Sequence, residues 1–131
     1  MRWVEVFAVF VVCHCVGDYL LQTEWQAKNK RGGLGRDPLA RRALASHVAI
    51  YTLAYVPALI WIGIELSLAA AVGIAIVIAV PHFVQDDGRL IMAYMTRVKH
   101  TDTVLDTPLF RSVDQSFHLL ALFGAALLTA A

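Results

Sequence analysis

The sequence predicts an all-α polytopic membrane protein. We expect a single domain over residues 1–131, built as a bundle of four transmembrane helices with an interfacial helix on its cytoplasmic side. The chain is 59% hydrophobic and 16% charged, with a mean hydropathy of +0.64, which is too apolar for an ordinary soluble domain. Four segments are long and apolar enough to cross a bilayer, and basic residues gather in two of their three connections.

A spanning helix needs about 20 mostly apolar residues. The predicted spans cover residues 3–22, 42–64, 66–86 and 110–130. A cleaved signal peptide is the alternative for the first span, but no small-x-small cleavage site follows its apolar run, so we expect a retained helix. Pro57 and Pro81 are expected to bend the second and third spans, because proline removes a backbone hydrogen bond.

The connections between the spans predict the orientation. Residues 23–41 and 87–109 carry most of the basic side chains, whereas the short second connection holds Glu65 and no basic residue. The positive-inside rule therefore places both long connections in the cytoplasm and both termini outside, as in a multi-pass protein of a bacterial inner membrane. Residues 89–99 mix apolar and basic side chains, which predicts an amphipathic helix on the cytoplasmic membrane surface.

Every predicted span carries a histidine, and three of them pair it with an aspartate four residues away. This offset places an imidazole and a carboxylate on one face of an α-helix. Taken singly, such a histidine is more often a hydrogen-bonded packing residue, and an aspartate can cap a helix end. At about 1.5 Å per residue, however, all of these groups fall at a shared depth near the cytoplasm. The sequence therefore predicts one cluster of His14, Asp18, His47, His82, Asp86, Asp114 and His118.

Imidazole and carboxylate groups converging from several helices are typical ligands of a metal site in a helical bundle. The predicted set exceeds what one tetrahedral zinc requires, so we expect one or two divalent ions, zinc above all, with some members orienting the ligands. An unpaired aspartate in a span costs about 2.5–3.5 kcal/mol on an insertion scale, which a metal or a His–Asp pair would remove. Cys13 and Cys15 flank His14, but their spacing allows no mutual disulfide and does not indicate ligation.

Further polar residues extend the same helix faces and are candidates for binding a substrate. Arg89 and Arg111 can hold an anionic group such as phosphate, although both also fit the positive-inside pattern. Gln22 and Tyr51 lie at helical spacing from cluster residues. Asp87 points in a different direction from its paired neighbour, and we expect it to face water or lipid head groups.

Four motifs of the chain, in order, resemble a bacterial multi-span membrane family of unknown function (domain of unknown function 3307). The family pattern is an H-x3-D-[FY]-x-L-Q opening, a lone His, an H-x3-D and a closing D-Q-x2-H. These motifs match residues 14–22, Ser46-His47, and residues 82–86 and 114–118, and Asn29-Lys30 fits the pattern after the first motif. The resemblance implies a membrane protein but supplies no reaction. More distantly, the His/Asp pattern is similar to proteins described as membrane-bound metal-dependent hydrolases.

The leading hypothesis is a membrane-embedded metal-dependent hydrolase that acts at the cytoplasmic side on a lipid-linked or membrane-accessible phosphoester. Water activated by the metal is the expected nucleophile, with Asp86, or else Asp114, as the general base. Arg89 or Arg111 would steady the phosphate.

The alternative is a metal-ion transporter, channel or sensor that uses the same cluster. Against transport, the outer halves of the third and fourth spans carry no polar path. A haem protein with two axial histidines leaves the remaining imidazoles and the aspartates unexplained. A net charge of +1 gives no case for nucleic acid; membrane lipid is the expected partner, and a homo-oligomer is left open.

Overall fold

The computed structural model describes residues 1–101 and 107–130, and this part of the chain is helical, with no strand. The predicted connection 87–109 therefore lies partly outside the described residues. The helices of the described residues, in chain order, are α1 (Trp3–Cys15), the π-helical turn η1 (Val16–Leu20), α2 (Glu24–Asn29), α3 (Pro38–Ala54), α4 (Val56–Glu65), α5 (Leu68–Asp86), α6 (Arg89–Arg97) and α7 (Pro108–Leu128).

Several helices begin at a side chain that accepts a hydrogen bond from the free N–H groups of the first turn. Asp37 caps α3, Ser67 caps α5 and Thr107 caps α7 in this way. Thr23 and Gln26 form a reciprocal capping box at the start of α2. These caps fix where the long helices start, and so fix which turn of each helix carries its polar residues.

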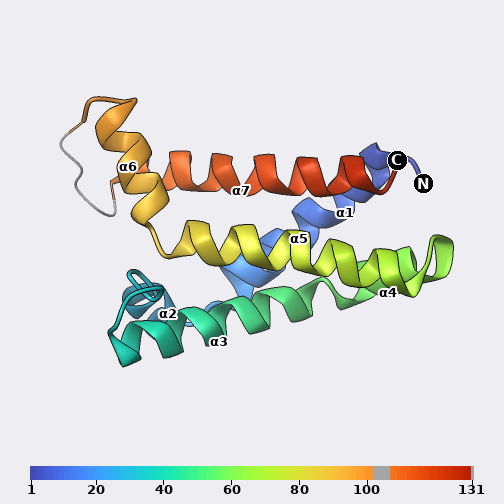
Figure 1. Cartoon of the computed structure of the whole chain (residues 1–131), viewed down its shortest axis with the longest axis horizontal. Coiled ribbons are helices and arrows are strands. Elements are labelled where there is room, and N and C mark those ends of the chain that lie inside the picture. The colour runs from blue at the N-terminus through green and yellow to red at the C-terminus, as the bar shows by residue number, and fades with distance from the viewer. Residues whose placement is uncertain (102–106, 131) are drawn as a thin grey trace.

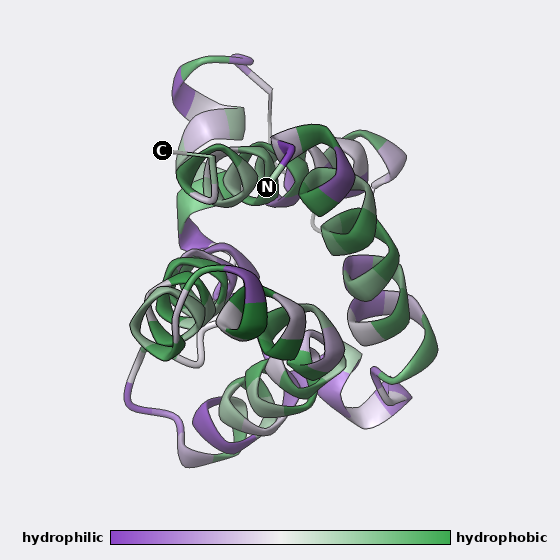
Figure 2. Ribbon diagram, turned by 90° about the vertical axis from the view of Figure 1, so that its right-hand side faces the viewer, coloured by the Kyte–Doolittle hydropathy of each residue, from purple (hydrophilic) through white to green (hydrophobic). Residues whose placement is uncertain are grey.

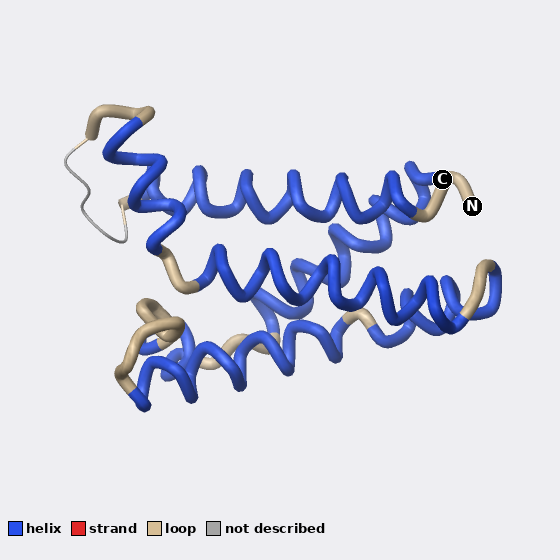
Figure 3. The backbone as a smooth tube through the Cα atoms, viewed as in Figure 1, coloured by secondary structure: helices blue, strands red, loops and turns tan. Residues whose placement is uncertain are grey.

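The long helices run side by side along the molecule. α5 lies between α7 and the α3–α4 pair, and α1 crosses behind them to pack against α7 (Figure 1). The loops before α3 and after α5 lie together with α2 and α6 at one end, which we call the loop end (Figure 3). Both termini and the α4–α5 turn lie at the opposite end, the terminal end (Figure 1).

The prediction of four spans is confirmed only in part. Residues Trp3–Leu20 and α5 are each long and apolar enough to cross a membrane, and α3 with α4 makes a third candidate if this pair, bent by 50°, is one span. The bend follows Tyr55 and has Pro57 in the first turn of α4, as expected. α7 does not pass the same test, because polar residues occupy its first half. α5 continues unbroken through Pro81.

Apolar side chains cover the outside of the helices as well as their interior. Viewed end-on, hydrophobic residues occupy most turns of the long helices (Figure 2). Large exposed examples include Val12, Ile60, Ile76 and Leu120. A surface of this kind is expected where helices face lipid, so it agrees with a membrane location.

The apolar core fills the part of the bundle nearer the terminal end. Val6 and Phe10 of α1 share one buried cluster with Ile62 of α4, Ile78 of α5 and Leu122 of α7. Polar residues are buried instead toward the loop end, where the first half of α7 meets the last turns of α5. We call these two parts the apolar half and the polar half; the polar half also contains a smaller apolar cluster of Ile91, Met95 and Phe110.

Hydrogen bonds join the loop between α2 and α3 to the end of α5. Asp87, expected to face water, is in fact buried: its Oδ1 accepts a hydrogen bond from the Leu34 N–H at 2.8 Å, and its Oδ2 lies 3.1 Å from Arg89 Nε. Gly32, in a left-handed conformation with φ of 76°, donates its N–H to the Asp87 carbonyl at 2.9 Å. These contacts hold the loop across the end of the polar half.

Candidate metal centre

Four side chains from three segments bring their donor atoms together in the polar half. His47 Nε2 lies 2.8 Å from Asp86 Oδ2 and 3.2 Å from Asp18 Oδ1. His82 Nε2 lies 3.1 Å from Asp86 Oδ2 and 4.0 Å from Asp18 Oδ1, and the Nε2 atoms of His47 and His82 are 3.1 Å apart. All four residues are buried. η1, α3 and α5 thus supply one compact group of two imidazoles and two carboxylates.

The spacing of these four atoms fits a bound metal ion. With metal–ligand distances of about 2.0–2.1 Å, the ligands of a tetrahedral site are about 3.4 Å apart. The observed separations of 2.8–4.0 Å surround this value. Asp18 Oδ1 is buried and makes no hydrogen bond of normal geometry, although His47 Nε2 is close to it. A group with an unsatisfied carboxylate oxygen and two facing imidazole nitrogens can hold a metal ion.

A second group shares Asp86 with the first. It consists of Asp86, Asp114 and His118. His118 Nδ1 lies 2.8 Å from the Asp114 carbonyl oxygen, which can only accept, so Nδ1 carries the proton. In the neutral ring the lone pair is then on Nε2, which is 3.4 Å from Asp86 Oδ1. Because the two oxygens of Asp86 face different groups, this carboxylate is placed to bridge two ions.

Asp18 reaches the centre because the first span changes its helical form. Val16–Leu20 is a π-helical turn, in which the Leu21 N–H bonds the Val16 carbonyl at 2.9 Å. A methyl group on Gly17 would lie 2.7 Å from the ring of Tyr51 and 3.2 Å from its Cα. Glycine therefore lets η1 approach α3 closely, and this approach places Asp18 beside His47.

His14 does not belong to either ligand group; it orients one of them. Gln115 Nε2 donates to Asp18 Oδ2 at 3.0 Å, so its Oε1 faces His14 Nε2 at 2.8 Å and requires that nitrogen to donate. His14 Nδ1 then accepts from the Tyr51 hydroxyl at 3.1 Å. Both nitrogens are occupied in this hydrogen-bonded chain, which holds Asp18 in place through Gln115.

Tyr51 and Tyr55 close the centre toward the apolar half. The Tyr51 ring stacks on His82, with centroids 3.4 Å apart and planes 6° apart. Its hydroxyl is 2.7 Å from that of Tyr55, and both rings are fully buried. Tyr51, predicted to bind substrate, thus lies under the cluster and positions His82 and His14.

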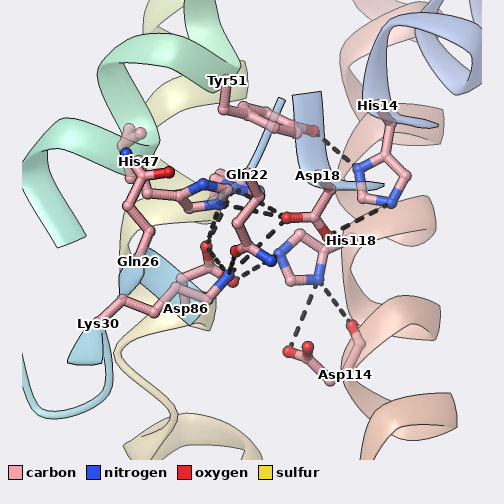
Figure 4. A network of polar contacts seen from close by, with 12 residues as sticks. His14, Asp18, Gln22, Gln26, Lys30, His47, Tyr51, Asp86, Asp114 and His118 are labelled. Carbon is pink, nitrogen blue, oxygen red and sulfur yellow. Dashed lines mark hydrogen bonds and ion pairs between the residues drawn. The ribbon is translucent and has the colours of Figure 1, made fainter. Parts of the chain in front are cut away.

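Lys30, which fits the family pattern but was given no role from the sequence, contributes a positive charge to the cluster. Its Nζ lies 2.8 Å from Asp86 Oδ2, 3.8 Å from Asp18 Oδ1 and 2.5 Å from Gln22 Oε1 (Figure 4). Only 12% of the side chain is exposed. Lys30 follows the last residue of the short helix α2, and Gln26 of that helix donates to Ser46 Oγ of α3 at 3.1 Å. The loop end thus delivers a cation to the two buried carboxylates.

A cavity of about 260 Å³ adjoins the cluster at the loop end. Asp18 and Asp114 belong to the ligand groups and also line this cavity. Other polar and basic residues that line the cavity are Gln22, Lys30, Arg31, Arg111 and Gln115. Gln22 and Arg111, predicted to bind substrate, thus both line this cavity. Arg89 does not line the cavity and is paired with Asp87 instead. The cavity joins a metal-capable group to three basic side chains.

The comparison with known families agrees with the pattern of motifs. The family model described as Protein of unknown function (DUF3307) matches residues 6–130. The chain belongs to this family. No curated protein and no solved structure matches it. Besides the ligands, two polar residues of these motifs connect helices: Ser46 Oγ accepts from Gln26 Nε2 at 3.1 Å, and Gln85 Nε2 donates to the Phe117 carbonyl at 3.1 Å.

Proposed function

We propose that the protein is a membrane-embedded, metal-dependent hydrolase that acts on a lipid-linked or membrane-accessible phosphoester. The observation that carries this proposal is the cavity that shares Asp18 and Asp114 with the ligand groups. Its volume of about 260 Å³ is just below the about 300–1,000 Å³ of pockets that enclose drug-sized ligands. A cavity of this size suits a phosphate-bearing head group whose apolar tail stays in the membrane.

The residues support one or two divalent ions, with zinc as the best match. Asp18, His47, His82 and Asp86 would hold the first ion, and His118 and Asp114 would complete a second site across Asp86. Two nitrogens with two carboxylate oxygens at tetrahedral spacing are typical zinc ligands. A divalent ion in this position would polarise a phosphoryl oxygen and make water a stronger nucleophile near neutral pH.

The remaining roles follow from exposure and contacts. Asp86 is engaged by His47, His82, His118 and Lys30 and is buried, so it is better suited to ligation than to proton transfer. Asp114 lines the cavity, and its side chain is 20% exposed, so we assign it the general base when only the first ion is bound. Arg111, exposed at the cavity, would bind the phosphate.

We further propose that α7 is the fourth span and that the loop end lies in the cytoplasm. α7 packs against both α1 and α5, which are apolar enough to span, and its second half is apolar. The basic residues of the loop end support the cytoplasmic side by the positive-inside rule, with both termini outside the inner membrane. α6 would then lie along the cytoplasmic surface, with Leu90 and Met92 exposed toward lipid.

Turnover of lipid phosphates tests this proposal. The protein, purified in mild detergent and loaded with Zn²⁺, is assayed for phosphate release from isoprenoid phosphates and phospholipids in mixed micelles. We expect release that Asp114→Asn abolishes while the ion of the first group, which lacks Asp114, stays bound, and that Arg111→Gln weakens chiefly through KM. Arg97→Gln, on the exposed part of α6, is the matched control and should leave turnover unchanged. If the metal-loaded protein releases no phosphate but transports metal ions across vesicle membranes, the hydrolase proposal is wrong and the protein is a transporter.

A further inference from the structure

Lys30 occupies a position that a metal ion would also require. Its ammonium lies 2.8 Å from Asp86 Oδ2, the same oxygen that faces His47 Nε2 at 2.8 Å and His82 Nε2 at 3.1 Å. It is also 3.8 Å from Asp18 Oδ1, the second carboxylate oxygen of the four-residue group. The lysine therefore supplies one positive charge to these two buried carboxylates.

The ammonium and a divalent ion compete for this oxygen. A metal bound by Asp86 Oδ2, His47 and His82 would be about 2.0–2.2 Å from each ligand atom, which places it within a few ångströms of Lys30 Nζ. Two positive charges so close repel strongly in a buried site, and both would use the same oxygen lone pairs. Metal binding therefore favours departure of the ammonium from Asp86.

Only the side chain of Lys30 is free to make this movement. Its backbone N–H bonds the Gln26 carbonyl at 2.9 Å, and its own carbonyl accepts from Gly33 at 3.2 Å. Gly33 is packed so closely on Leu44 that a methyl group there would meet it at 2.6 Å. The four-carbon stem, in contrast, is flexible, and Lys30 also lines the cavity. An ammonium that leaves Asp86 thus turns into the cavity, beside Arg111.

We propose that Lys30 is a built-in counter-cation, which metal binding displaces from Asp86 into the adjoining cavity, where it becomes part of an anion site for phosphate. This inference rests on the metal site of the proposed function and adds an order of events: metal first, then the anion. Metal loading and anion binding are coupled through one side chain, so that each raises the affinity for the other.

The substitution Lys30→Met tests the exchange because it keeps the length of the side chain and removes its charge. In the metal-free protein we expect a lower melting temperature, since two carboxylates lose their counter-cation. We expect Zn²⁺ affinity to rise about tenfold and inorganic phosphate affinity of the Zn²⁺-loaded protein to fall about tenfold. Lys28→Met is the matched control: Lys28 lies in α2, two residues before Lys30, is exposed and pairs with Glu24, so neither affinity should change.

The opposite directions of these effects separate exchange from a structural role. If Lys30→Met weakens Zn²⁺ and phosphate binding together, Lys30 is a structural residue and the inference is overturned, while the metal site of the proposed function stands. If the wild-type protein binds no Zn²⁺, the proposed function fails, and the inference fails with it.

A measurement on the wild-type protein covers the case in which Lys30→Met does not fold. Acetylation of lysines, followed by mass spectrometry, reports how accessible each ammonium is. We expect the labelling rate of Lys30 to rise several-fold on Zn²⁺ loading, with Lys28 as the internal reference. A Lys30 rate that stays constant while Zn²⁺ binds stoichiometrically would overturn the exchange.

Discussion

In the half of the bundle near the termini, Phe10, Ile62 and Leu122 share one apolar core, whereas the half near the loops buries histidines and aspartates beside a smaller apolar cluster and the nearly buried Lys30. Tyr51 and Tyr55 lie at the border, with their rings in the apolar core and the Tyr51 hydroxyl bonded to His14. Apolar burial stabilises a fold without directing it to a ligand. Converging donors in a buried site do the reverse, since they cost free energy unless a cation satisfies them. We therefore expect the apolar half to stabilise the fold and the polar half to carry the chemistry.

Removing the Asp86 carboxylate, which both ligand groups share, should have the largest effect on metal binding. Asp86→Asn takes away the oxygen charges that face His47, His82, His118 and Lys30. We expect Zn²⁺ affinity to fall at least about 1,000-fold, equivalent to about 4 kcal/mol, because both ligand groups lose a member. Competition with a chromophoric chelator measures this. An affinity within a factor of ten of wild type would show that Asp86 is not a ligand.

The reciprocal change belongs in the apolar half. Ile62 is completely buried in α4, and Ile62→Ala should lower the free energy of unfolding by about 3 kcal/mol through lost burial and a cavity. Zn²⁺ stoichiometry of the folded fraction should not change. Denaturant unfolding in detergent micelles and metal analysis together check both statements. Loss of metal from a folded Ile62→Ala protein would show that the halves are not independent.

The backbone contact that positions Asp18 gives a somewhat smaller effect. Gly17→Ala forces a methyl group against Tyr51 and should destabilise the protein by about 1–3 kcal/mol through overpacking, with weaker Zn²⁺ binding because η1 must shift. Gly73→Ala is the matched control. A methyl group at Gly73, also helical, meets nothing within 4 Å, so this change should be neutral or stabilising by about 0.5–1 kcal/mol. Equal stability of the two variants would refute the close approach.

The smallest expected effect comes from the residue that acts through others. His14→Ala removes the partner of Gln115 and so loosens Asp18, and we expect about tenfold weaker Zn²⁺ binding with one or two ions still bound. Cys15→Ala, at an exposed position in the same helix, is the control. If His14→Ala abolishes metal binding as fully as Asp86→Asn does, His14 is a ligand and not an orienting residue.

Much of the polar half could be predicted because it depends on helical periodicity and depth. The convergence of His47, His82 and His118 with Asp18 and Asp86 followed from the four-residue offset and from the orientation of the spans. The distinct place of His14 did not, because the π-helical turn after Cys15 changes the register that a regular helix would give. Periodicity assigns a face to a residue only while the helix stays regular.

Residues outside the regular helices could not be predicted in the same way. Lys30 comes from a loop, and its place beside Asp86 depends on how α2 and the following glycines dock on α3 and α5. Arg89 has the right spacing from His82, but the left-handed Gly88 starts a new helix and turns this arginine toward Asp87. The predicted fourth span, α7, is not apolar enough to count as a membrane span for a related reason: the residues that build the site make its first half polar.

The central claim is that the polar half holds metal, and elemental analysis of the purified protein tests it most directly. Protein extracted in mild detergent without chelators is compared with the double variant His47→Ala/His82→Ala and with His100→Ala, which removes an exposed histidine outside the cluster. We expect at least one equivalent of a divalent metal per chain in the wild type and in His100→Ala, and none in the double variant. A wild-type protein without stoichiometric metal, or a folded double variant that keeps it, would contradict the claim.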